Sequence, residues 1–143
     1  TILTALMHDH QPYGVPTGAH RSNVLWFNTK LLERAGVARP SSSYTIDSFI
    51  SVLKKIKASG STPLCLGAKD SFTTVELFEN TLLSTIGIRG WQDMVDDDLD
   101  WRGDEVQAAL DRFGAILGYA DPDASGLRKL ETRRRSGSSF PGL

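Results

Sequence analysis

The feature that most constrains the fold of this chain is a helical hydrophobic repeat that begins after Thr45 and ends at Gly60. Threonine is a favoured helix N-cap, lysines in the last turns complement the helix dipole, and glycine commonly ends a helix. A face this apolar must be buried against other elements, so the repeat predicts a packed, helix-containing domain. The apolar residues that recur at helical spacing are Ile46, Phe49, Ile50, Leu53 and Ile56.

Weaker periodic patterns predict three more helices. The first is short, capped by Asn28 and ended by Gly36. The second runs from about Phe72 to Ile86, and the third is capped by Asp104. Their predicted apolar faces are Leu31, Leu32 and Ala35 in the first, Val75, Phe78, Leu82 and Ile86 in the second, and Val106, Leu110, Phe113 and Leu117 in the third.

Two short apolar runs, Val24–Phe27 and Thr62–Leu66, predict buried strands. Tyr13–Pro16 reads as an extended segment, because its proline suits an edge or a strand end. Cys65 lies in the second run and is predicted to be a buried structural thiol. The expected fold class is therefore α/β and helix-dominated, with at least four helices and two or three short strands.

The composition argues against several functions. A length of 143 residues suits one domain, and a formal net charge of -1 provides no field that would attract nucleic acid or an anionic membrane. No apolar stretch approaches the roughly 20 residues needed to cross a bilayer. The run of residues at the start of the sequence is too short for a signal peptide, and it lacks the basic region that a signal peptide has. We therefore expect a soluble chain that binds no nucleic acid.

No catalytic constellation or cofactor motif is visible in the sequence. It has neither a Gly-x-Ser-x-Gly elbow nor a glycine-rich phosphate loop. The run His8–His10 lacks a third metal ligand, and Asp96–Asp98 with Asp100 predict a solvated turn instead of paired catalytic carboxylates. The chain is predicted to be no enzyme and to use no metal or other cofactor.

Polar hydrogen-bonding groups gather ahead of the first predicted strand. His20, Arg21 and Asn23 place an imidazole, a guanidinium and a carboxamide within four residues. Sugar sites combine such groups with flat apolar faces. A polar loop above a core strand is the alternative interpretation.

Several short motifs follow one another along the chain. They are Gly14-Val15-Pro16, His20-Arg21-Ser22-Asn23, Phe27-Asn28, Lys57-Ala58-Ser59-Gly60 and Leu77-Phe78-Glu79. Their order and spacing resemble those of the extracellular solute-binding proteins of carbohydrate ABC importers, the family of the maltose- and glucose-binding proteins. The tetrad that starts at His20 is similar to that of the glucose/mannose-type binders.

The resemblance implies a periplasmic-binding-protein-like fold, in which two lobes close over a sugar. Residues 13–126 would form part of the second lobe and residues 1–12 an N-terminal segment. The parent protein would bind a mono- or oligosaccharide, contact the membrane subunits of the importer and lie outside the cytoplasm. The implied ligand-binding residues, with a phenylalanine ring for stacking, are His20, Arg21, Asn23, Phe72, Thr73 and Glu76.

Residues 127–143 depart from the resemblance, because five basic residues and one acidic residue occur there without helical periodicity. They predict a disordered, non-homologous tail, explained by a shifted reading frame or by natural divergence. A partial lobe is expected to bind sugar weakly and to form a homodimer through its unpartnered apolar faces, with domain swapping as one route to it. The alternative function is a non-enzymatic protein-interaction module.

Overall fold

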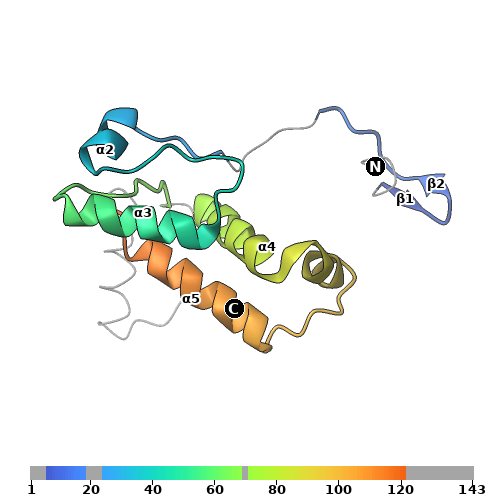
Figure 1. Cartoon of the computed structure of the whole chain (residues 1–143). Coiled ribbons are helices and arrows are strands. Elements are labelled where there is room, and N and C mark those ends of the chain that lie inside the picture. Colours follow the sequence, from blue (N-terminus) through green and yellow to red (C-terminus); the bar gives the residue numbers. More distant parts are fainter. Residues whose placement is uncertain (1–5, 19–23, 69–70, 122–143) are drawn as a thin grey trace, which may run out of the picture.

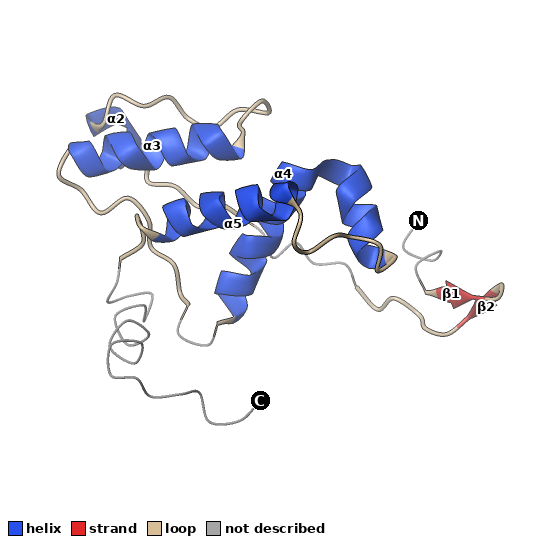
Figure 2. Cartoon of the chain, turned by 90° about the horizontal axis from the view of Figure 1, so that it is seen from below, coloured by secondary structure: helices blue, strands red, loops and turns tan. Residues whose placement is uncertain are grey.

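The computed structural model describes residues 6–18, 24–68 and 71–121 of the chain. Figures 1 and 2 show a body of helices with a small hairpin standing apart from it. Within the described residues the fold is helix-dominated with two short strands, as predicted. The elements are β1 (Met7–His8), β2 (Gln11–Pro12), α2 (Thr29–Arg34), α3 (Ile46–Ala58), α4 (Phe72–Val95) and α5 (Asp104–Leu117).

The starts of α2 and α3 are fixed by the capping residues that the sequence indicated. The side-chain oxygen of Asn28 accepts hydrogen bonds from the backbone N–H groups of Lys30 and Leu31, at 3.1 and 3.3 Å. Thr45 Oγ1 accepts one from the backbone N–H of Ser48 at 3.1 Å. Each cap satisfies donors that the first helical turn leaves open, so these boundaries are set locally.

The first part of the core lies between α4 and α5. Its buried residues are joined by Phe78, whose ring meets that of Phe113 edge-to-face at a centroid distance of 5.5 Å. This geometry suits the quadrupoles of two aromatic rings. The buried cluster consists of Leu82, Ile86, Val106 and Ala109.

The second part of the core lies where the chain after α3 meets the end of α5. Leu66, Ala68 and Ala120 are buried together there. A single parallel bridge joins Leu64 to Ala120, and the backbone N–H of Asp121 donates to the carbonyl of Leu64 at 2.8 Å. The two segments thus begin a sheet that goes no further in the part of the chain the structure describes.

One ion pair links α3 to α5. Arg112 Nε lies 3.0 Å from Asp47 Oδ1, and Arg112 Nη2 lies 3.3 Å from Asp47 Oδ2, which is a bidentate arrangement. The hydrogen bond from Arg112 lowers the pKa of Asp47, desolvation opposes this effect, and the attraction between the two charges adds to the lowering. Because both side chains reach solvent, the pair stabilises the helix contact only modestly.

We expect Asp47→Asn to lower the melting temperature slightly at pH 7 and to have no effect in strong acid. The folded pKa of Asp47 is depressed, so its contribution is present above about pH 4 and is lost as the pH falls through the folded value. Thermal unfolding at several pH values measures this, with exposed Asp93→Asn as the control. An undiminished effect at pH 2 would contradict the assignment.

The strands lie elsewhere than predicted. Val24–Phe27 forms no strand, and its four side chains are between 45% and 88% exposed. Thr62–Leu66 contributes only the bridge at Leu64, and Cys65 is exposed instead of buried. The strands that do form pair Met7 with Pro12 and His8 with Gln11 across a tight turn. An apolar run becomes a buried strand only where neighbours pair with it and cover it. Among the described residues no strand pairs with Val24–Phe27, and Thr62–Leu66 is paired only through the bridge at Leu64.

Two helices differ in detail from the prediction. Helix α4 continues beyond Ile86 to Val95 across a kink at Gly87, and the N-cap of α5 is Gly103, one residue before Asp104. The apolar faces are also shifted, since Val75 and Leu110 are 53% and 44% exposed. No helix among the described residues is long and apolar enough to span a membrane. The predicted tail, residues 127–143, lies outside the described residues.

Candidate functional site

An apolar groove with a volume of about 570 Å³ runs among α2, α3, α4 and the segments that connect them. Burial raises the pKa of Tyr44 in its wall, and the Tyr44 ring meets that of Phe49 edge-to-face at 6.4 Å. The apolar side chains that line the groove outside α4 are Val24, Leu25, Trp26, Phe27, Leu31, Leu32, Pro40, Tyr44, Ile46, Phe49, Val52, Leu53, Ile56, Pro63, Leu64, Cys65 and Leu66.

Helix α4 supplies the polar wall of this groove. Thr73, Glu76, Asn80 and Ser84 recur at helical spacing and all line it. Asn80 Nδ2 donates to the Glu76 carbonyl at 2.7 Å, and Ser84 Oγ donates to the Asn80 carbonyl at 2.7 Å. The half-buried Glu76 carboxylate has no ion-pair partner among the described residues, so its oxygens remain available as acceptors.

The structure brings together two of the six predicted ligand-binding residues. Thr73 and Glu76 lie three residues apart on the groove face of α4. Phe72 is the first residue of α4, but it is 64% exposed and does not line the groove. The remaining three, His20, Arg21 and Asn23, lie outside the described residues.

The start of α4 has an unusual cap. Ser71 adopts a left-handed conformation with φ 69°, and its side chain makes no capping hydrogen bond. A non-glycine residue in this region costs about 1 kcal/mol or more. The positive end of the helix dipole therefore lies beside Thr73 without a Ser71 side-chain acceptor.

Sequence reasoning missed the aromatic side chains beside the polar wall. Trp26 is 88% exposed and Phe27 is 45% exposed, and both line the groove. They belong to a continuous apolar run, which by itself predicts a buried strand. Their position directly after a polar cluster is the signal that distinguishes an exposed aromatic surface from a core strand. The same groove therefore has aromatic side chains and the polar wall of α4 among its lining residues.

Other candidate chemistry is absent from the described residues. No group of three or more His, Cys, Asp or Glu side chains in residues 6–18, 24–68 and 71–121 is placed to hold a metal ion. His8 Nε2 lies 3.6 Å from Asp9 Oδ2, and both side chains are at least 80% exposed. Residues 96–98 and Asp100 are exposed in and around a turn, where Asp100 Oδ1 accepts from the Arg102 N–H at 2.9 Å. The acidic run is thus the solvated turn that the sequence predicted.

The chain is similar in sequence to several binding proteins of ABC transporters. An ABC transporter extracellular-binding protein of Pyrococcus horikoshii is 30% identical over 122 residues, which cover 85% of this chain and 27% of that protein. A probable sugar-binding periplasmic protein of Mesorhizobium japonicum is 30% identical over 113 residues, which cover 78% of this chain and 26% of that protein. The xylose/arabinose-binding protein of Haloferax volcanii is 29% identical over 122 residues, which cover 84% of this chain and 26% of that protein. No solved structure gives a significant match.

These relatives are much longer than this chain, which spans about a quarter of their length. Residues 1–126 match the family model described as bacterial extracellular solute-binding protein. The match includes the motifs on which the resemblance was based, and it ends one residue before the basic tail. The chain belongs to the bacterial extracellular solute-binding protein family.

Proposed function

We propose that this chain is part of the second lobe of a two-lobed protein that binds mono- or oligosaccharides for import by an ABC transporter. The observation that carries the proposal is the family match over residues 1–126. Relatives described as sugar-binding periplasmic proteins and as a xylose/arabinose-binding protein give the ligand class. The parent protein acts by binding and not by catalysis, outside the cytoplasm, and delivers its ligand to the membrane subunits of the importer.

We place the sugar contacts along the start of α4 and the polar cluster before Val24. Glu76 and Thr73 offer oxygen acceptors to sugar hydroxyls, and both lie on the same wall of the groove. Phe72, exposed at the first position of α4, offers a ring for stacking. His20, Arg21 and Asn23 complete the proposed set as further hydrogen-bonding residues.

We assign residues 13–126 to the lobe, residues 1–12 to an N-terminal segment and residues 127–143 to a non-homologous tail. The hairpin ends at Pro12, which supports the first boundary. The family match ends at residue 126, which supports the second. All six residues proposed above for the sugar contacts lie within residues 13–126.

The isolated chain is expected to bind glucose or maltose with a dissociation constant in the millimolar range or weaker. A clamp that holds its ligand between two lobes loses most of its contacts when one is missing, and the ligand stays wet. Titration with each sugar, followed by amide NMR, measures the affinity and the location. Shifts should concentrate at the amides of Thr73 and Glu76.

Two variants of α4 sharpen this titration. Glu76→Gln removes a charge from the groove wall and should weaken the binding several-fold, because hydrogen bonds to charged groups are the stronger ones. Glu79→Gln makes the same change at an exposed position that does not line the groove, and should have no effect. Micromolar affinity, or shifts that avoid Thr73 and Glu76, would contradict the proposal.

We also propose that the isolated chain forms a homodimer through its apolar groove. Trp26, Phe27 and Leu25 expose 88%, 45% and 45% of their surface, and contiguous exposed apolar surface is rare on monomers. The hairpin of β1 and β2 stands apart from the helices in Figures 1 and 2, which makes it the candidate segment for a domain swap.

Light scattering is expected to give twice the mass of one chain, with a monomer appearing on dilution. Trp26→Ser should shift the equilibrium toward monomer, because it removes the most exposed ring of the groove. Trp101→Ser is the matched control, since Trp101 is 52% exposed outside the groove. A mass of one chain at all concentrations, or an equal effect of both substitutions, would refute the dimer.

A further inference from the structure

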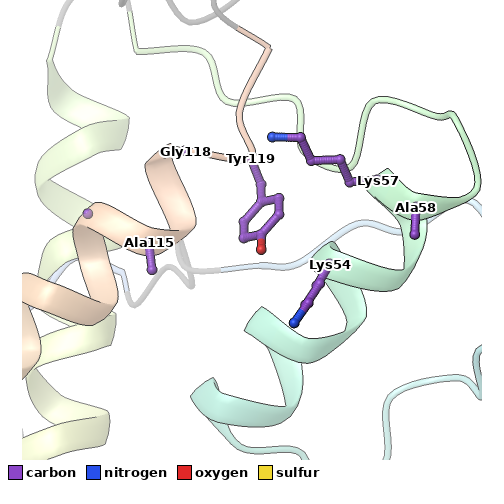
Figure 3. A pocket seen from close by; sticks show the side chains of 7 residues that line it. Lys54, Lys57, Ala58, Ala115, Gly118 and Tyr119 are labelled. Carbon is purple, nitrogen blue, oxygen red and sulfur yellow. The ribbon is translucent and has the colours of Figure 1, made fainter.

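We draw no further inference here: the strongest candidate, the surface pocket where the C-terminal ends of α3 and α5 meet (Figure 3), is lined by exposed lysines whose ammonium groups do not converge, and nothing among the described residues points to a ligand for it.

Discussion

Replacing Leu82 by alanine is expected to lower the free energy of unfolding by about 2–5 kcal/mol, the usual cost of removing a buried leucine side chain. Leu82 is 1% exposed and packs with Ile86, Val106 and Ala109 between α4 and α5. Its truncation removes favourable burial and leaves a cavity that the two helices close only in part. Urea unfolding followed by circular dichroism at 222 nm measures the loss.

Leu83→Ala provides the matched control for this experiment. Leu83 is the next residue of α4 and has the same side chain, but it is 37% exposed and belongs to neither buried cluster. Its truncation should cost clearly less than that of Leu82, within about 1 kcal/mol, because partly exposed positions lose little burial. Equal losses at the two positions would mean that α4 and α5 do not form the core in solution.

The helices were predictable because their signals are local. Thr45, the apolar repeat that follows it and the C-terminal lysines all lie within one helix length, so short-range physics fixes α3. The same holds for α2, where one asparagine satisfies two backbone donors. The boundary of α5 was off by one residue, since a glycine occupies the capping position that the neighbouring aspartate could equally fill.

The strands were not predictable, because strand formation depends on distant segments. Val24–Phe27 has the composition of a buried strand, yet nothing pairs with it among the described residues. Leu64 pairs in a bridge with Ala120, 56 positions along the chain. The hairpin at Met7–Pro12 could not be predicted for a different reason, which is that its turn lacks the usual local sequence signal. Its turn places Asp9 and His10 at positive φ, without the Asn-Gly or Asp-Gly pair that announces such turns.

The same distinction between local and distant signals applies to the residues that line the groove and the surface pocket. Thr73 and Glu76 followed from a resemblance between linear motifs, which needs no knowledge of packing. The surface pocket lined by Lys54, Lys57 and Tyr119 could not be predicted from the sequence, because its walls come from α3 and the end of α5. Only the packing of these two helices, held in part by the Asp47–Arg112 pair, brings those residues together.

Gly87→Ala is expected to destabilise the chain by about 1–3 kcal/mol, the cost of holding a residue in a backbone region that only glycine occupies readily. Gly87 lies at φ 68° and ψ −173°, where α4 bends after the segment that lines the groove and packs against α5. There is space for a methyl group at this position, so the cost comes from the backbone and not from a clash.

Gly114→Ala is the control, because Gly114 is a helical glycine without a positive φ and with equal space. There, alanine should stabilise the chain by about 0.5–1 kcal/mol, since it restricts the unfolded chain and favours the helix. Urea unfolding of both variants decides the matter. A Gly87→Ala variant as stable as the original chain would mean that α4 runs straight through residue 87, and that its groove-lining half is not set apart by a kink.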